Sequence, residues 1–239
     1  MPDTCAIVLA AGLSRRMGSV NKLLLSIDGE ILVRRVVAAC AAVTQHPVTV
    51  VTGYQDVAIK EALRDAPVSF VHNPRFENGQ MTSVGAGLRG APTAQTYLVA
   101  LGDQPMISSD DLKELLGVHH AKANIRITVP RVEGVRGNPI AVPAMQRARM
   151  LADPFHLGCR KLTRGSPEHV NVFETNNRSF VIDLDTPADL SLFGLSENLT
   201  VGAPVNRIRR TANAIRKRLF PPMTNEQIEL LATIKFPCC

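Results

Sequence analysis

The residues best suited to chemistry lie in one stretch near the start of the chain, CAIVLAAGLSRRMGSVNK, residues 5–22. Its small residues allow the backbone to pass close to a ligand, and its basic residues are interspersed among them. Backbone amides and Arg and Lys side chains are the usual donors to phosphate oxygens. The stretch therefore predicts a loop that binds a polyphosphate, and the alternative is an ordinary strand-to-helix turn with two surface arginines. The residues concerned are Ala11, Gly12, Ser14, Arg15, Arg16, Gly18 and Lys22.

This loop does not have either of the common phosphate-loop sequences. GxxxxGK[ST] requires Lys and a hydroxyl residue directly after a second glycine, and GxGxxG requires a glycine at position 14, which is Ser14 here. If this stretch binds phosphate, it must be a third kind of phosphate loop.

A carboxylate follows a second apolar run, where LGDQP places Asp103 just after residues 97–101. A carboxylate at the carboxyl end of a central parallel strand is well placed to bind a hard cation such as Mg²⁺, which prefers oxygen ligands and bridges phosphates. We therefore expect Asp103 to be a metal ligand. The next helix, residues 110–119, is capped by Ser108 or Ser109, and its own acidic residues are expected to be structural.

Two further acidic residues, Asp183 and Asp185, alternate in FVIDLDTPADL, residues 180–190. If residues 180–184 form a strand, both side chains lie on one face, next to a helix that Thr186 caps and Pro187 begins. They are either metal ligands or solvated acids of a capped turn.

The segment NPRFENGQMTSVGAGLRG, residues 73–90, has a similar ambiguity. Thr82 and Ser83 fall in the first turn of a predicted helix, residues 80–88, and small residues including Gly87 leave space on one face. Either the start of the helix is open to a ligand, or the small residues permit a tightly packed helix pair.

The elements that must position these residues alternate between strand and helix. Apolar and β-branched runs predict strands over residues 5–10, 48–52, 68–72 and 97–101, separated by helical patterns over 31–43, 55–64 and 80–88. This order predicts an α/β Rossmann-like three-layer fold with a mostly parallel sheet, which binds ligands at the carboxyl ends of its strands. Later strands are expected over 125–130, 139–143, 170–174 and 180–184, and a helix over 145–151. The prolines of PIAVP, residues 139–143, predict an edge position for that strand.

Composition is that of an ordinary globular protein, with 239 residues, 45% hydrophobic and 20% charged. The absence of a leader and of a long apolar run predicts a cytoplasmic protein without a transmembrane segment. Cys5 and Cys40 are expected to be core residues because they lie in apolar segments. Cys238 and Cys239 could form an inert tail, an intermolecular disulfide or a lipidation site.

The net charge of +6 is concentrated at the C-terminus, since residues 195–239 carry seven basic and three acidic residues. With aromatic residues at 4% and no Trp, nucleic acid is not an expected partner. We expect a nucleotide-binding domain over residues 1–194 and a basic helical extension over 195–239. The extension could dock on the domain, form a dimer, or bind an anionic partner or a membrane surface.

Taken in order, LAAGLSRRMGSVNK, NGQMTSVGAGL, LGDQP, GNP and DLDTPADL resemble the MobA-like nucleotidyltransferases over about residues 4–193. Within that family the sequence is most similar to the molybdenum cofactor cytidylyltransferases, because Leu9, Ala10, Ala11 and Gly12 match their LAAG, whereas the guanylyltransferases usually have LAGG.

The resemblance implies transfer of CMP from CTP to the terminal phosphate of molybdopterin, with release of pyrophosphate. Arg16 and Lys22 would neutralise the phosphates, and Asp103 and Asp185 would hold Mg²⁺. Such catalysis needs positioning and charge rather than a protein nucleophile. The implied acceptor-binding residues are Gly137, Asn138 and Pro139. The implied nucleotide-binding residues are Leu9, Ala10, Ala11, Gly12, Ser14, Arg16, Gly18, Lys22, Thr82, Ser83 and Gly87.

Two alternatives accompany this prediction. One is nucleotidyl transfer to another phosphorylated acceptor, such as a sugar or alcohol phosphate. The other is a non-catalytic accessory protein that binds the molybdenum cofactor. A molybdenum hydroxylase that receives the cofactor is the protein partner that the resemblance implies.

Overall fold

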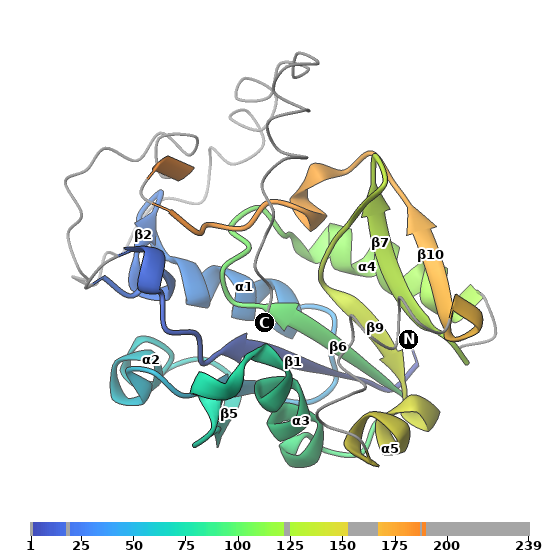
Figure 1. Ribbon diagram of the computed structural model, residues 1–239, viewed down its shortest axis with the longest axis horizontal. Coiled ribbons are helices and arrows are strands. Elements are labelled where there is room, and N and C mark those ends of the chain that lie inside the picture. The colour runs from blue at the N-terminus through green and yellow to red at the C-terminus, as the bar shows by residue number, and fades with distance from the viewer. Residues whose placement is uncertain (1, 18–19, 122–124, 153–166, 187, 190–239) are drawn as a thin grey trace. The chain divides into compact units, whose positions relative to one another are not determined.

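Strand β1 (Thr4–Ala10) lies inside an eight-stranded sheet, where its uninterrupted apolar sequence is buried on both faces. The computed structural model describes residues 2–17, 20–121, 125–152, 167–186 and 188–189 (Figure 1). Val8 packs into the core on one face of the sheet and Ile7 into the core on the other. This two-sided burial explains why the strand has no polar alternation.

The sheet order is β10-β7-β9-β6-β1-β4-β5, and the hairpin strand β8 pairs with β7. Pairing is parallel from β6 through β1 and β4 to β5, and again between β7 and β10. The predicted, mostly parallel sheet is confirmed. The remaining strands are β4 (Val48–Thr52), β5 (Val68–His72), β6 (Thr96–Leu101), β7 (Ile127–Val132), β8 (Val135–Arg136), β9 (Ile140–Pro143) and β10 (Val170–Glu174).

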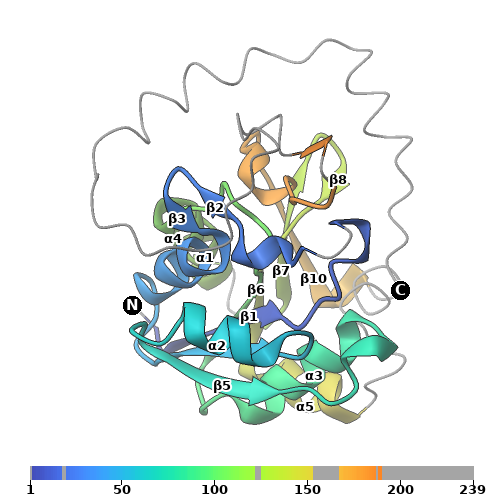
Figure 2. The same cartoon turned by 90° about the vertical axis from the view of Figure 1, so that its left-hand side faces the viewer.

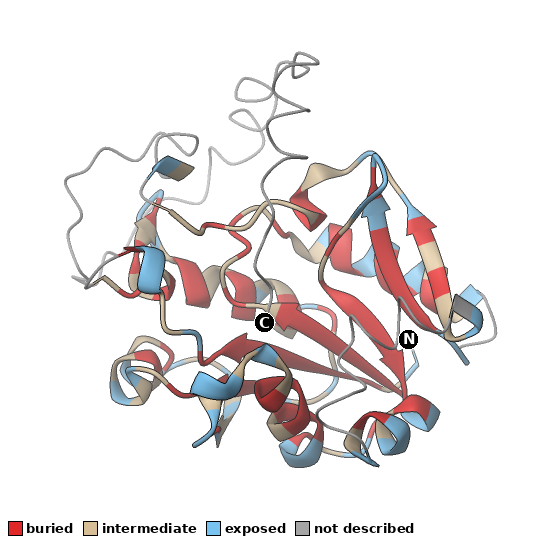
Figure 3. Cartoon of the chain, viewed as in Figure 1, coloured by how far each residue is buried: buried red, intermediate tan, exposed pale blue. Residues whose placement is uncertain are grey.

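Helices cover both faces of this sheet, as the alternating pattern predicts (Figures 1 and 2). Side chains of α1 (Leu32–Ala41), α2 (Asp56–Ala62) and α4 (Ser109–Ala121) join one apolar core, and those of α3 (Gln80–Gly90) and α5 (Ala144–Ala152) join the other. Strands β1, β6 and β9 are buried along almost their whole length (Figure 3). The sheet is therefore a rigid base for the loops at its carboxyl edge.

Short elements complete the described part of the chain. Strands β2 (Ser26–Ile27) and β3 (Glu30–Ile31) form a separate hairpin, and its turn residues Asp28 and Gly29 both have positive φ angles. The 3-10 turns are η1 (Arg15–Met17), η2 (Lys22–Leu24), η3 (Phe76–Asn78), η4 (Pro167–His169) and η5 (Arg178–Phe180).

The edge position predicted for residues 139–143 is wrong. Strand β9 lies between β6 and β7 and pairs antiparallel with both. Pro139 precedes the strand and Pro143 is its last residue, so neither proline interrupts the pairing of Ala141 and Val142 with β6. Prolines at the two ends of a strand are compatible with a central position.

The strand predicted over residues 180–184 is also absent. Asn177 caps η5 by accepting a hydrogen bond from Ser179 N, and the carbonyl oxygen of Phe180 accepts one from Asn138 N at 2.8 Å. Loop contacts therefore occupy the backbone groups that a strand would use. Residues 195–239, for which the sequence predicts a basic helical extension, lie outside the described residues, and so does Pro187, the predicted first residue of the helix that Thr186 caps.

Candidate active site

The two loops that carry the predicted chemistry leave the sheet side by side. Strands β1 and β6 are parallel neighbours with Leu9 paired to Leu101, so residues 11–22 and 102–105 both begin at the same carboxyl edge. The amide of Gly102 continues this pairing by donating to Leu9 O at 3.0 Å. A Cβ on Gly102 would lie 3.0 Å from that oxygen, so a glycine allows the close approach of the two chains.

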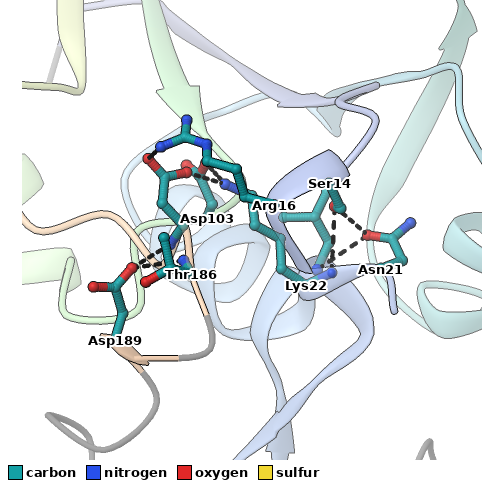
Figure 4. A network of polar contacts seen from close by, with 9 residues as sticks. Ser14, Arg16, Asn21, Lys22, Asp103, Thr186 and Asp189 are labelled. Atoms are coloured by element: carbon teal, nitrogen blue, oxygen red, sulfur yellow. Dashed lines mark hydrogen bonds and ion pairs between the residues drawn. The ribbon is translucent and has the colours of Figure 1, made fainter. Parts of the chain in front are cut away.

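Lys22 is the centre of the charged network at this edge (Figure 4). Its Nζ donates to Asp103 Oδ2 at 2.5 Å and to Asp185 Oδ1 at 2.7 Å, and the three side chains are between 11% and 19% exposed. Arg16, whose side chain is half exposed, contacts the other carboxylate oxygen of Asp185 at 3.1 Å. The structure thus brings together the four charged residues predicted for the site.

The network also determines the charge states of its members. Burial acts to lower the pKa of Lys22, but the charges and hydrogen bonds of Asp103 and Asp185 outweigh burial, so the pKa is raised and the side chain stays cationic. Burial, together with the nearby charges of Asp103 and Asp185, raises the pKa of Asp183 to about 8. Two carboxylates therefore contact Lys22, and Asp183 is a third acidic group buried close to their charges.

Local hydrogen bonds fix the loop that carries Lys22. Ser14 has a φ angle of 50° and accepts a hydrogen bond from Lys22 N at 3.4 Å through its hydroxyl oxygen. Asn21 caps η2 by accepting from Leu23 N at 3.1 Å. The hydroxyl of Ser14 therefore lies against the backbone of the catalytic lysine candidate.

The other nucleotide-binding residues predicted in this stretch lie at the end of β1 and in the loop after it. Leu9 and Ala10 are buried strand residues, and nothing lies within 4 Å of a Cβ built on Gly12. Gly18 lies outside the described residues. A Cβ on Gly53 would lie 2.9 Å from the Cβ of Ala11 and 2.7 Å from that of Phe76. Ala11 therefore belongs to a close-packed contact next to the loop.

The second predicted motif is hydrogen-bonded within itself. Asn73 Nδ2 donates to Thr82 Oγ1 at 2.8 Å and to Ser83 Oγ at 2.9 Å, and the Thr82 hydroxyl faces the carbonyls of Arg75 and Gly79, both at 2.8 Å. Thr82 and Ser83 are both buried. Their hydroxyl groups therefore close the loop before α3.

Gly87 packs α3 against the sheet. A Cβ at this position would lie 2.5 Å from Ile7 Cγ2 and 2.9 Å from Val51 Cγ2. Gly87 therefore lets α3 pack closely on the sheet, and the partner at this position is not the second helix that the packing alternative predicts.

The predicted acceptor residues Gly137, Asn138 and Pro139 form a loop between β8 and β9, with a cis peptide bond before Pro139. A Cβ on Gly137 would lie 2.4 Å from Phe180 O, so this loop lies directly against the segment that leads to Asp185.

Sequence reasoning missed three residues around the site. Asp189 Oδ2 accepts from the backbone amides of Asp185 and Thr186 at 2.9 and 2.7 Å, which holds the Asp185 backbone in place (Figure 4). Asn73 organises the second loop, and Gln104 is a fully buried neighbour of Asp103. The spacing of Thr186 and Asp189 is that of a capping box, which is a signal that was available in the sequence.

The carboxylates fit a divalent cation. Asp103 Oδ1 and Asp183 Oδ1 are buried and have no hydrogen-bond partner among the described residues. Within the same residues, no group of three or more His, Cys, Asp or Glu side chains is arranged to hold a metal ion unaided. Magnesium sites often use one or two carboxylates and complete the coordination with substrate phosphates and water. The donor set therefore fits a cation that a bound phosphate would share.

The sheet order, the loop after β1 and the convergent charged residues are typical of a nucleotide-binding α/β enzyme. Residues 6–172 match the model of the MobA-like NTP transferase domain family, and the chain belongs to this family. It is a nucleotidyltransferase with a Rossmann-like fold.

Three comparisons illustrate this relationship. A molybdenum cofactor cytidylyltransferase of Escherichia coli (strain K12) is 28% identical over 188 residues, covering 77% of this chain and 91% of that protein. A nicotine blue oxidoreductase of Paenarthrobacter nicotinovorans is 29% identical over 192 residues, covering 78% and 94%. The solved structure of a nucleotidyl transferase from Methanothermobacter thermautotroptrophicus has a TM-score of 0.67 at 22% identity, covering 79% and 94%. No helix among the described residues is long and apolar enough to cross a membrane.

Proposed function

We propose that this enzyme transfers CMP from CTP to the terminal phosphate of molybdopterin and releases pyrophosphate. The observation that carries the proposal is the contact of Lys22 with both Asp103 and Asp185 at the carboxyl edge of the sheet. An ammonium group suited to phosphates and two carboxylates suited to a metal ion thereby lie next to one another. The similarity to the Escherichia coli cytidylyltransferase supports this donor and acceptor.

In the proposed reaction, an oxygen of the acceptor phosphate attacks the α-phosphorus of the nucleotide. The bond from that phosphorus to the bridging oxygen breaks, and the electron pair leaves with pyrophosphate. Lys22 and Arg16 stabilise the negative charge of the phosphates, since both lie at the loop after β1. Asp103 and Asp185 would hold Mg²⁺, which supplies charge neutralisation at the phosphate oxygens.

The choice of CTP depends on Ala11, by the resemblance of Leu9–Gly12 to the cytidylyl branch. Ala11 is buried, and its carbonyl accepts a hydrogen bond from Tyr54 N at 3.4 Å. Ala11 and Phe76 both pack closely around Gly53, where a Cβ would meet either side chain, and this packing supports a fixed position for Ala11. Ala11→Gly is expected to reduce the preference for CTP over GTP in a competition assay.

The decisive experiment incubates the full chain with Mg²⁺, each of the four nucleoside triphosphates and a set of acceptors, and measures pyrophosphate. The proposal expects release with CTP and molybdopterin together, at a rate well above that with either alone. Pyrophosphate release with a sugar or alcohol phosphate, and not with molybdopterin, would identify that phosphate as the acceptor. Binding of the cofactor without release would support an accessory protein.

The relative named as an oxidoreductase adds one control to this experiment. NADH and NADPH consumption is followed in the same mixtures. Nucleotide-independent consumption with no pyrophosphate would contradict the proposed function.

We also propose that the enzyme acts in the cytoplasm, that residues 1–194 form the catalytic domain and that residues 195–239 form a separate basic extension. Deleting residues 203–239 and measuring pyrophosphate release tests the division of the chain. The proposal expects transfer activity to remain.

A further inference from the structure

Gln104 is a buried polar side chain that the proposed reaction does not use. It follows Asp103 directly in the loop after β6 and is 0% exposed. Burying an amide is costly unless it is hydrogen-bonded, and a methionine of similar length would avoid that cost. The partners of Gln104 therefore indicate what the amide contributes.

The amide donates to two backbone carbonyls that are distant in sequence. Gln104 Nε2 lies 3.1 Å from Asn138 O and 3.2 Å from Phe180 O. Asn138 belongs to the proposed acceptor loop, and Phe180 begins the segment that leads to Asp185. One side chain thus bridges the loop of Asp103, the acceptor loop and the second carboxylate segment.

Backbone hydrogen bonds tie the same three segments together around Gln104. Asn138 N donates to Phe180 O at 2.8 Å, and Leu184 N donates to Asp103 O at 2.9 Å. Phe180 O consequently accepts from both Asn138 and Gln104, which makes it the point at which the acceptor loop is fixed to the carboxylate segment.

We propose that Gln104 is a positioning residue that sets the loop 137–139 at a defined place relative to Asp103 and Asp185. This inference rests on the proposed function, in which that loop binds the acceptor and those carboxylates lie at the nucleotide. Its loss shifts the acceptor relative to the α-phosphorus, whereas Lys22 and Arg16, which meet the nucleotide, keep their own contacts. Gln104 therefore affects the acceptor and the transfer rate more than nucleotide binding.

The chain supplies a matched control for this proposal. Gln146 on α5 is 6% exposed, and its Nε2 donates to Ile125 O at 3.2 Å, so it is a second buried glutamine bonded to a backbone carbonyl. It is not among the residues of the site. Gln104→Met and Gln146→Met each remove a buried amide, and both are expected to lower the melting temperature by a few degrees.

The kinetic test varies CTP and acceptor separately in the two variants. Gln104→Met is expected to raise the KM for the acceptor and lower kcat, for a combined loss of about 30-fold in kcat/KM, because small misplacements of reacting groups are costly. Its KM for CTP is expected to stay within about twofold of the wild-type value, as is every parameter of Gln146→Met. Equal effects of the two variants, or an equal rise in both KM values of Gln104→Met, would overturn the proposal.

Hydrogen exchange provides a test that does not depend on the identity of the acceptor. In Gln104→Met the amide of Asn138 is expected to exchange about fivefold faster, because a net hydrogen bond contributes about 1 kcal/mol and a factor of ten corresponds to about 1.4 kcal/mol. Gln146→Met is expected to leave this amide unchanged. Unchanged protection of Asn138 in Gln104→Met overturns the inference even if the wild type releases pyrophosphate. Faster exchange in a protein that releases none would count against the proposed function alone.

Gln104→Glu is a second variant for the case that Gln104→Met does not fold. It keeps the shape of the side chain, but a carboxyl group donates to at most one of the carbonyls of Asn138 and Phe180 when protonated and to neither when ionised. The same kinetic and exchange pattern is expected, and a wild-type pattern in this variant contradicts the proposal.

Discussion

The loop after β1 and the loop after β5 both leave the carboxyl edge of the sheet, yet they use their polar side chains in opposite ways. Lys22 and Arg16 of the first loop reach Asp103 and Asp185, which belong to other segments. Asn73 of the second loop hydrogen-bonds to Thr82 and Ser83, which lie in the first turn of α3 at the end of that loop.

This difference separates residues that can respond to a ligand from residues that shape the loop. The charged groups of the first loop can exchange one partner for another, because a phosphate or a cation can replace a carboxylate or an ammonium group. The hydroxyl groups of the second loop are buried and bonded to backbone and amide groups. Substitutions in the first loop are therefore expected to affect activity, and those in the second to affect stability.

The largest effect is expected for Asp103→Asn. This change keeps the shape of the side chain but removes the charge that holds Lys22 and, in the proposed reaction, Mg²⁺. We expect kcat to fall about 1,000-fold, in the range seen when a preorganised electrostatic contact is removed. The rate of pyrophosphate release at saturating substrates measures this fall in kcat. Asp110→Asn, at an exposed carboxylate paired with Lys113, is the control and is expected to retain activity.

Lys22→Met tests the charged loop without an activity assay. Two carboxylates lose their internal cation, so Mn²⁺ is expected to bind about tenfold more tightly in the absence of nucleotide, while CTP binds more weakly. Electron paramagnetic resonance of free Mn²⁺ and calorimetry with CTP measure the two affinities. Weaker Mn²⁺ binding in this variant would show that Lys22 supports the metal site instead of competing for its carboxylates.

Thr82→Val tests the second loop. The buried hydroxyl contacts Asn73, Arg75 O and Gly79 O, so its loss is expected to lower the free energy of unfolding by about 2 kcal/mol. Urea denaturation measures this change. Ser83→Ala removes one contact and is expected to cost about half as much. A loss of CTP affinity in Thr82→Val without loss of stability would remove the contrast between the loops.

The smallest effects are expected within α3. Gly87→Ala places a Cβ 2.5 Å from Ile7 Cγ2 and is expected to destabilise the protein by about 1 kcal/mol or more. At Gly85 the nearest atom to a new Cβ is the flexible end of Arg89 at 3.4 Å. Gly85→Ala is therefore expected to be neutral or to stabilise the helix by up to about 1 kcal/mol. Paired urea denaturation curves compare the two variants.

Much of the fold was predictable because local patterns and tertiary structure agree. The apolar run at β1 and the β-branched run at β4 predict strands of a mostly parallel sheet, and both strands are buried throughout. The mutual hydrogen bonds of Ser108 and Asp111 likewise confirm the predicted capping of α4. These features depend on neighbouring residues, which a sequence displays directly.

The parts that sequence reasoning missed depend on distant partners. Pro139 and Pro143 look incompatible with a central strand until the register of β9 with β6 is known. Phe180 is a good strand residue, but its carbonyl is bonded to Asn138 and Gln104, which no local pattern displays. The role of Thr82 in nucleotide binding stays a prediction, and only the structure shows the hydrogen bond that its hydroxyl oxygen accepts from Asn73.

The Lys22–Asp185 ion pair joins residues that are 163 positions apart in the chain. A protein emerging from the ribosome cannot complete this pair until almost the whole domain has been synthesised, although the loop of Lys22 appears among the first residues. The charged centre is therefore assembled last from the earliest and latest segments of the domain. A chain that stops short of Asp185 can form most of the sheet and still lack the complete charged network.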